Sequence, residues 1–459
     1  MIQQIAFWVV SAIALGLAIR QFGKVRRNIL LGEEETISGD SGQRMRNMLL
    51  VAFGQKKMFK RIIPAVLHFI LYAAFVITQI ELIEIFIDGM FGQHRFFAPY
   101  LGGFYTFMIS FIEVLSLGAF VATVIFLIRR NGLAIPRFKK PEMKGWPKLD
   151  ANLILVFEII LLIGIFTMNG TDMVIQQNNM DPEHYPSTGN LAVSSWLGPM
   201  LFGGLDFETL HVLERSGWWL HILMVFLFLN YLPYSKHLHI LLAFPNTYYA
   251  RLKPRGEMDN MPAIMNEVKS MMGIGEQNGE PDMSMDEELP EFGSKDVFSL
   301  SWKNIMDAYS CTECGRCTAE CPANITGKKL SPRKILMDIR DRAEEVGKKL
   351  DSGSNEYKIN AEEPLSKTNF DDGKSLFDYI SREELHACTT CNACVEACPV
   401  LINPLEPILK MRRYEILTES AGPADWVPMF TAVENSGAVW SMPNERADWT
   451  KDLEESQDA

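Results

Sequence analysis

The segment Cys311-Thr-Glu-Cys314-Gly-Arg-Cys317-Thr-Ala-Glu-Cys321-Pro322 recurs later in the chain as Cys388-Thr-Thr-Cys391-Asn-Ala-Cys394-Val-Glu-Ala-Cys398-Pro399. In each copy, three cysteines at i, i+3 and i+6 let a short, curved backbone offer three thiolates to one face of a cubane cluster. The fourth cysteine, followed by proline, points away and serves the other cluster. The repeat therefore predicts a ferredoxin-type domain with two [4Fe-4S] clusters.

The predicted ligand sets cross between the two copies and use all eight cysteines of the chain. Cluster one takes Cys311, Cys314, Cys317 and Cys398, and cluster two takes Cys388, Cys391, Cys394 and Cys321. The alternative is a pair of zinc ribbons, but a zinc site needs two CxxC pairs and would leave the middle and last cysteines of each run without a role. Because the cysteines are confined to two tight runs, we interpret them as metal ligands in a reducing compartment rather than as disulfides.

Five apolar runs precede the repeat, at about residues 5–19, 62–87, 103–128, 151–168 and 218–242. Apolar runs of this kind cross a bilayer as helices. Ten lysines and arginines lie between the first two runs and seven between the third and fourth, whereas the opposite connections hold only Arg95 and Arg215. The positive-inside rule then places the N-terminus outside and the chain after the fifth run in the cytoplasm.

The fold class predicted from these patterns is an all-α membrane bundle of five helices followed by a cytoplasmic, mainly helical two-cluster domain. The boundaries are 1–250 for the bundle, 251–300 for an acidic, Met-rich linker, 301–420 for the cluster domain and 421–459 for a tail. Helical periodicity follows each cysteine run, at residues 331–346 and 404–417, with Ser331 as N-cap and Pro332 as the first helical residue. The net charge of −12 excludes a nucleic-acid partner, since phosphate binding needs a basic face.

Three histidines in the apolar runs are candidate haem ligands, because a histidine at membrane depth is costly unless it binds or pairs. His68 and His239 both fall near the predicted cytoplasmic side, so we expect them to hold one b-type haem. His221 falls near the outer end of the fifth run. It lies 18 residues before His239, which on one helix would be five turns, or about 27 Å.

The cysteine motifs resemble those of the C-subunit type of heterodisulfide reductase and of the cluster-bearing subunit of anaerobic glycerol-3-phosphate dehydrogenase. The resemblance runs from about residue 297 to the C-terminus. No Cys-Cys pair occurs in the chain, so the paired-cysteine motif of the active heterodisulfide reductase subunits is absent. The resemblance therefore implies a separate cytoplasmic catalytic redox subunit, either an iron–sulfur protein with that motif or a flavoprotein.

The bundle resembles the gamma subunit of respiratory nitrate reductase, through its five spans and the segment from Trp219-Leu-His221 to Pro233-Tyr-Ser-Lys-His-Leu-His239. That family carries two histidines ten residues apart in its second span, where this chain has His68 but Thr78. A second haem at His221 is therefore an open question. Either it is lost, or its other ligand comes from one of three outer histidines, His94, His184 and His211.

Together these features predict a membrane subunit of a quinone-linked oxidoreductase in a bacterial or archaeal plasma membrane. Electrons would pass between the cytoplasmic partner and the quinone pool through the clusters and the haem. If only the haem of His68 and His239 exists, quinone is expected toward the cytoplasmic half, with Glu158 exchanging its protons, because a shielded carboxylate suits that role near neutral pH. A site at the outer face near Glu81 or Glu84 is the alternative and would go with a second haem. The alternatives are a redox-driven proton or ion pump, which the glutamates in the spans would favour, and a membrane anchor with structural metal sites.

Overall fold

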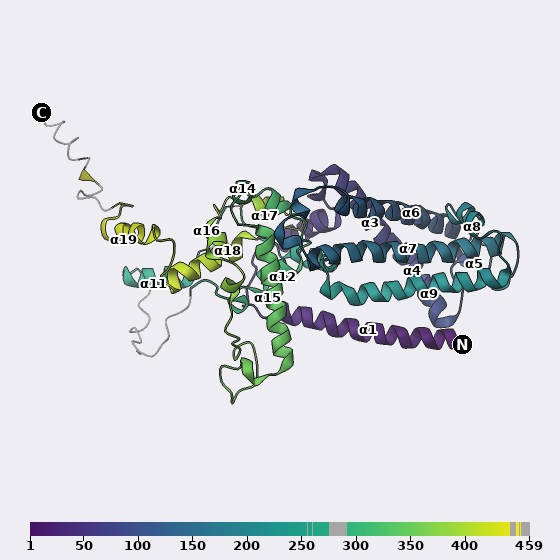
Figure 1. Cartoon of the computed structure of the whole chain (residues 1–459), viewed down its shortest axis with the longest axis horizontal. Helices are drawn as coiled ribbons and strands as arrows, with labels where there is room; N and C mark the ends of the chain where they lie inside the picture. Colours follow the sequence, from purple (N-terminus) through teal and green to yellow (C-terminus); the bar gives the residue numbers. More distant parts are fainter. Residues whose placement is uncertain (255, 259, 275–291, 441–446, 449, 451–459) are drawn as a thin grey trace.

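The computed structural model describes residues 1–254, 256–258, 260–274, 292–440, 447–448 and 450. Within these residues the chain is mostly helical and holds no strand beyond one isolated bridge between Glu33 and Ser301. A long helical bundle and a smaller cysteine-bearing domain lie end to end (Figure 1). The predicted fold class is confirmed.

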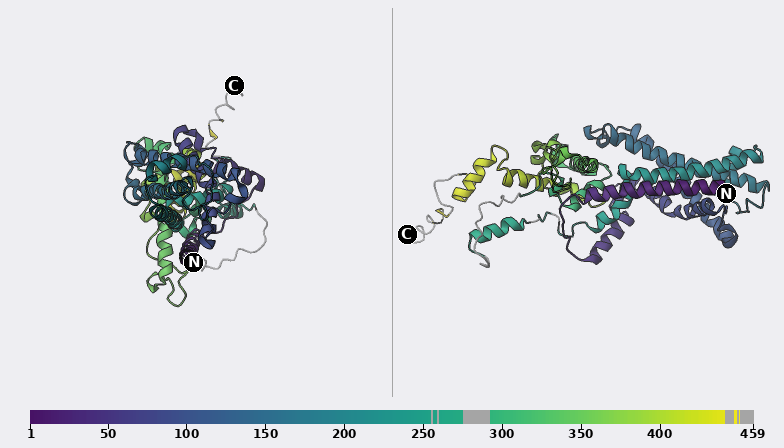
Figure 2. Two further views of the ribbon diagram at one scale, coloured as in Figure 1. Left: turned by 90° about the vertical axis from the view of Figure 1, so that its right-hand side faces the viewer. Right: turned by 90° about the horizontal axis from the view of Figure 1, so that it is seen from below.

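The bundle contains five helices that are long and apolar enough to cross a membrane. They are α1 (Ile2–Ile29), α3 with α4 (Ile62–Ile77 and Gln79–Phe91, meeting at Thr78), α6 (Gly103–Asn131), α7 (Trp146–Gln177) and α9 (Phe207–Tyr231). Large apolar side chains such as Ile83 and Phe107 are more than half exposed on the outside of the bundle, as lipid contact allows. We call the end beside the cysteine domain proximal and the end holding the N-terminus distal (Figure 2).

The fourth span is longer than the sequence predicted, and the fifth begins and ends earlier. The predicted outer loop at residues 169–217 in fact begins with the last turns of α7 and ends with the first turns of α9. These turns carry Asn169, Asp172 and Glu214, which are at most 1% exposed. Their charge suggested a loop, but partners inside the bundle satisfy them, and the helices continue.

The placement of His221 and His239 on one straight helix is wrong. Helix α9 ends at Tyr231, and two 3-10 turns follow, Leu232–Tyr234 and Lys236–Leu238, before α10 (His239–Tyr248). Pro233 lacks a backbone N–H, which favours a break at this point. The two imidazoles therefore belong to different helices.

Helices α7 and α9 touch through glycines. A Cβ atom at Gly164 would lie 3.0 Å from the backbone nitrogen of His221, and one at Gly217 would lie 2.7 Å from that of Met168. Only residues without a side chain permit this approach. It sets His221 against the middle of α7.

The cysteine domain is built on α12 (Trp302–Tyr309) and α15 (Pro332–Ser352), around a core that includes the fully buried Ile305, Ile335 and Val346. The predicted cap is confirmed, since the Ser331 hydroxyl accepts a hydrogen bond from the Lys334 N–H at 3.4 Å. Short helices flank the cysteines: α13 (Arg316–Ala319), α14 (Pro322–Ile325), α16 (Arg382–His386), α17 (Ala393–Ala397) and α18 (Leu405–Arg413).

The remaining helices are peripheral: α2 (Ser41–Asn47), α5 (Ala98–Leu101), α8 (Ser194–Phe202), α11 (Pro262–Met271) and α19 (Trp426–Ser436). Residues 275–291 of the predicted linker and most of residues 441–459 of the predicted tail lie outside the described residues.

Basic residues at the proximal end of the bundle hold the cysteine domain. Lys236 pairs with Glu313, and Arg61 pairs with Glu320 at 3.0 Å. One ion pair has its charges reversed, with the base on the cysteine domain and the acid on the bundle: the buried Arg333 of α15 pairs with Glu142 of the α6–α7 connection at 2.8 Å. The two connections with the most basic residues, α1–α3 and α6–α7, thus both face the cysteine domain. This arrangement supports placing both connections on the same side of the membrane.

Candidate functional site

Two hollows in the cysteine domain collect the eight thiols. One hollow is lined by Cys311, Cys314, Cys317 and Cys398, and the other by Cys321, Cys388, Cys391 and Cys394. Each hollow therefore takes three cysteines from one copy of the motif and one from the other, which is the crossed arrangement of the sequence prediction.

The two copies reach this geometry by the same backbone path. Glu313 and Thr390, at equivalent positions, have φ values of 54° and 56°, and Gly315 and Asn392 have 69° and 61°. Left-handed residues on both sides of the second cysteine curl the loop around the hollow. This curl lets the Glu313 N–H donate to the Cys311 sulfur at 3.4 Å, and the Thr390 N–H to the Cys388 sulfur at 3.4 Å.

The chemistry of these buried thiols suits metal ligands better than free cysteines. Burial, together with the neighbouring thiols, raises the pKa of Cys311, Cys394 and Cys398 to about 12. At neutral pH these groups would be protonated without a metal, and a cluster displaces their protons on binding. The donor set and the sulfur-directed N–H groups therefore fit [4Fe-4S] clusters, and cluster binding is coupled to folding of the domain.

The two hollows differ in surroundings. Cys391 in the second hollow is exposed, whereas Cys311, Cys317 and Cys398 in or beside the first are buried. Arg316, which lines the first hollow, donates to the Lys57 carbonyl at 3.2 Å. The first hollow thus faces the membrane bundle and the second reaches the surface.

His68 and His239 meet at the proximal end, as predicted. Their ring centres lie 6.4 Å apart. The Nδ1 atom of His68 is 3.1 Å from the Gln55 side-chain oxygen, and that of His239 is 3.0 Å from the Lys236 carbonyl. Both partners are acceptors, so each Nδ1 carries hydrogen and each Nε2 lone pair is available to a metal.

This geometry passes a simple test for a haem. With about 2 Å from iron to each Nε2, two axial imidazoles have ring centres about 6 Å apart. Burial lowers the pKa of His239, which keeps the imidazole in the neutral form that binds metals. The pair therefore fits a bis-histidine haem.

His237 lies beside this pair. Its ring centre lies 5.8 Å from that of His239, and its buried Nδ1 has no hydrogen-bond partner in the part of the chain that the structure describes. Burial lowers its pKa to about 3. The 3-10 turn at Lys236–Leu238, which sequence periodicity did not reveal, turns it inward.

A cavity of about 350 Å³ lies inside the bundle next to this pair. Its walls are mainly apolar, and its polar lining includes Thr78, Glu81, Glu158, His221 and His237. Glu158 has no hydrogen bond or ion pair among the described residues. The Nδ1 atom of His221 lies 3.2 Å from the Leu161 carbonyl.

His221 and Glu158 were expected in opposite halves of the membrane, and that expectation is wrong. They share one cavity because α9 starts at Phe207, so His221 sits in the middle of the helix and not at its outer end. Thr78, which stands where the nitrate reductase family has its second histidine of span two, lines the same cavity.

The three outer histidines do not meet His221. His94 bonds to Asp172 at 3.3 Å, eleven residues beyond Leu161 on α7, which is about 16 Å along the helix. His211 is ten residues from His221 on α9, or about 15 Å. His184 is exposed and pairs with Asp181 at 3.0 Å. No second axial ligand for His221 comes from this set.

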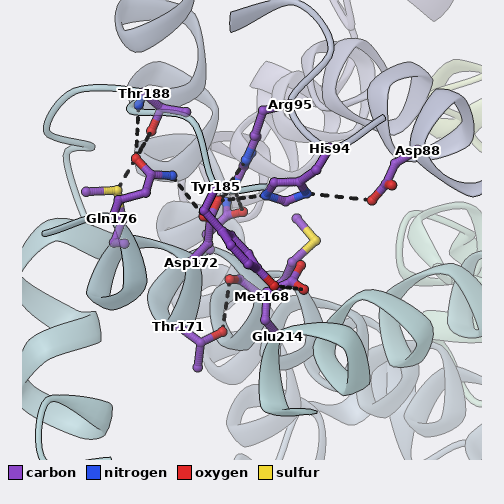
Figure 3. Close-up of polar contacts among 12 residues, drawn as sticks. Asp88, His94, Arg95, Met168, Thr171, Asp172, Gln176, Tyr185, Thr188 and Glu214 are labelled. Carbon is purple, nitrogen blue, oxygen red and sulfur yellow. Dashed lines mark hydrogen bonds and ion pairs between the residues drawn. The ribbon is translucent and has the colours of Figure 1, made fainter. Parts of the chain in front are cut away.

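Beyond the cavity, the distal end holds a buried polar network (Figure 3). Arg95 pairs with Asp172 at 2.9 Å, and Arg215 pairs with Asp88 at 3.1 Å. Although burial lowers it, the carboxylates of Asp172 and Asp88 raise the pKa of His94 to about 9. The sequence alone pointed to isolated glutamates in the spans and not to this network.

Residues 310–402 match the family model of the 4Fe-4S dicluster domain. This segment is a 4Fe-4S dicluster domain. It carries the eight cysteines in ferredoxin-like motifs, so the iron–sulfur prediction is confirmed at this level.

Three relatives are similar over different parts of the chain. The probable iron-sulfur-binding oxidoreductase FadF of Bacillus subtilis (strain 168) is 25% identical over 98% of this chain and 61% of its own length. The EtfAB:quinone oxidoreductase of Syntrophomonas wolfei is 24% identical over 95% of this chain and 58% of its own. The third relative, one subunit of the ferredoxin/F(420)H(2)-dependent CoB-CoM heterodisulfide reductase of Methanosarcina acetivorans, is 29% identical over 27% of this chain and 55% of its own.

The chain thus spans about three fifths of the length of the first two relatives. The third agrees with the heterodisulfide reductase resemblance of the cysteine domain. No solved structure matches the chain. The resemblance of the bundle to a cytochrome b stays a prediction.

Proposed function

We propose that this chain is the membrane subunit of a quinone-linked oxidoreductase complex, carrying electrons between a cytoplasmic catalytic partner and the membrane quinone pool. The observation that carries the proposal is the order of sites along the molecule. The hollow with the exposed Cys391 (the surface hollow), the hollow whose Arg316 contacts Lys57 (the inner hollow), the His68–His239 pair and the cavity lie between the cysteine domain's surface and the middle of the bundle. When bound, two [4Fe-4S] clusters and one b-type haem would supply one-electron transfer from the hollows of the cysteine domain to the cavity, or in the reverse direction.

Hydrogen bonds and ion pairs between the cysteine domain and the bundle connect these sites. The segment from Gln55 to Lys57 joins the inner hollow to the histidine pair, since Lys57 accepts from Arg316 and Gln55 accepts from His68. Lys236 has a similar double role, because its side chain pairs with Glu313 and its carbonyl orients His239. These hydrogen bonds and ion pairs join residues far apart in sequence and so connect the cysteine domain to the histidine pair.

The cavity has the character of a quinone site. It is largely apolar, with a few polar groups that converge on it, as small-molecule sites usually are. Because the Leu161 carbonyl can only accept, His221 carries hydrogen on Nδ1 and leaves Nε2 free to accept from a quinol hydroxyl. We therefore assign His221 to the quinone and not to a second haem.

The names of the relatives suggest the two ends of the path. The relative called EtfAB:quinone oxidoreductase supports quinone as the membrane end, and EtfAB or a protein like it as the soluble partner. The exposed Cys391 marks where such a partner would approach. In this proposal the cysteine domain is cytoplasmic and the bundle lies in a bacterial or archaeal plasma membrane.

Glu158→Gln tests the quinone site. Removing a carboxylate that exchanges protons with quinone should slow quinone reduction or quinol oxidation at least about tenfold, while the cluster and haem spectra stay unchanged. Rates with a short-chain quinone, measured on protein in lipid vesicles, check this.

Glu113→Gln is the matched control, because Glu113 is a buried carboxylate of α6 that does not line the cavity and accepts from the Val193 and Ser194 N–H groups. Equal rates for Glu158→Gln and the parent would remove Glu158 from the reaction.

A further inference from the structure

The distal network contains more buried acid than buried base. Five carboxylates are 7% exposed or less, namely Glu81, Glu84, Asp88, Asp172 and Glu214. Two guanidinium groups, Arg95 and Arg215, lie among them. Fully ionised, the set has a charge of +2 − 5 = −3, or −2 when His94 is protonated. Uncompensated charge of this size is too costly inside a membrane bundle, so the network must retain protons.

One end of the network opens on the cavity. Glu81 lines the cavity, and its Oε1 accepts from the Asn169 amide at 3.2 Å. The same oxygen lies 3.6 Å from the Arg95 guanidinium, which also bonds to Asp172 at 2.9 Å. Arg95 keeps its own protons and contacts both carboxylates. Proton transfer between Glu81 and Asp172 therefore requires a water molecule beside the guanidinium.

The other end approaches the distal surface. Asp172 bonds to His94 at 3.3 Å, and the His94 ring packs against Tyr185 with ring centres 5.3 Å apart (Figure 3). The Tyr185 hydroxyl is 2.6 Å from the Nδ1 atom of the half-buried His211 and 3.3 Å from Glu214. Each of these groups can both give and take a proton. The His94 and Tyr185 side chains touch through their rings and share no direct hydrogen bond, so proton transfer between them needs a bridging water molecule.

No comparable series leaves the cavity toward the proximal end within the described residues. Glu158 has no polar partner there, and the buried Nδ1 of His237 has none. Glu81 is therefore the cavity carboxylate that has a polar connection to the surface.

We propose that Glu81 exchanges protons with the cavity, where quinone and Glu158 lie, and that Asp172, His94, Tyr185 and His211 carry those protons to and from the distal surface. This inference rests on the proposed quinone reaction. In reduction, two electrons arrive from the cluster side, two protons enter from the distal side, and two O–H bonds form on the quinone. Quinol oxidation is the same process in reverse. Electrons and protons then reach the cavity from opposite faces, and each electron transferred is accompanied by one proton from the distal side.

The test uses the full chain with its cofactors in sealed vesicles that contain quinone and a trapped pH indicator. A membrane-impermeant reductant added outside reduces only molecules whose cysteine domain faces outward, so the distal end of every active molecule faces the lumen. We expect the lumen to become alkaline as quinone is reduced, by about one proton per electron. Glu81→Gln should lower both the quinone reduction rate and the lumenal pH change at least tenfold, with cluster and haem spectra intact.

Tyr185→Phe removes one hydroxyl from the path and is a second test that does not depend on correct folding of the Glu81→Gln protein. We expect it to slow quinone reduction and the lumenal pH change at least fivefold. Tyr105→Phe is its control, because that buried hydroxyl donates to Glu84 and accepts from Arg95 at 3.4 Å but is not one of the proton carriers of the proposed path. A parent that reduces quinone without changing the lumenal pH, or normal turnover in both Glu81→Gln and Tyr185→Phe, overturns the path and leaves the quinone site in place. A parent whose clusters are not oxidised by quinone overturns the proposed function, and this inference with it.

Discussion

Protein purified with His68→Ala or His239→Ala should contain no low-spin haem. Each imidazole is fixed by a hydrogen bond at Nδ1, and the two rings are already separated as two axial ligands would be. Losing either one removes half of the axial ligation, and no other described histidine except His237 lies close to the pair. The pyridine haemochrome assay should fall from about one haem per chain to less than about one tenth.

His221→Ala is the control for this prediction and should keep the haem, because His221 bonds to Leu161 on α7 and lies apart from the pair. Cluster absorbance should remain in all three variants, which separates ligand loss from unfolding. Full haem content in both His68→Ala and His239→Ala would refute the assignment. Loss in His237→Ala with retention in His239→Ala would instead move the second ligand to His237.

The second large effect concerns Cys321→Ser. This thiol lines the hollow of Cys388, Cys391 and Cys394, although it follows Cys317 in sequence. The substitution should therefore remove or convert the surface cluster and spare the inner one, lowering iron from about eight to about four atoms per chain if the cluster is lost. EPR of the reduced protein distinguishes the two clusters by their spectra.

Cys317→Ser is the matched variant, because it lines the other hollow, and it should give the reciprocal result. If Cys321→Ser and Cys317→Ser affected the same cluster, the ligands would not cross. Because the ligands join residues far apart in sequence, we also expect both variants to be less resistant to denaturant than the parent.

The cysteine repeat was predictable because its chemistry depends on local spacing. Three sulfurs at i, i+3 and i+6 come together in one tight loop, and the crossing of the fourth follows from the repeat itself. The His68–His239 pair was also predictable, since charge asymmetry between loops placed both residues at one end of the bundle.

The polar ends of α7 and α9 were not predictable from composition. Asp172 looks like a loop residue until Arg95, from the connection between α4 and α5, is brought beside it. Glu214 likewise looks like a loop residue until the Tyr185 hydroxyl, from the connection between α7 and α8, donates to it at 3.3 Å. The shared cavity of His221 and Glu158 was also missed. The depth of His221 in the membrane depends on where α9 begins, and the polar first turns of α9 hid that start. His237 was missed because the break after Tyr231 replaces one helical period with two 3-10 turns.

The most direct test of the account is whether quinone oxidises the clusters by way of the histidine pair. The parent and the haem-free His68→Ala protein, both in vesicles, are reduced anaerobically and mixed with a short-chain quinone while cluster and haem absorbance are followed. The account predicts that the clusters of the parent are reoxidised, and that those of His68→Ala, though present, are reoxidised at least about a hundredfold more slowly. Reoxidation at the parental rate in His68→Ala, or clusters that stay reduced in the parent, would contradict it.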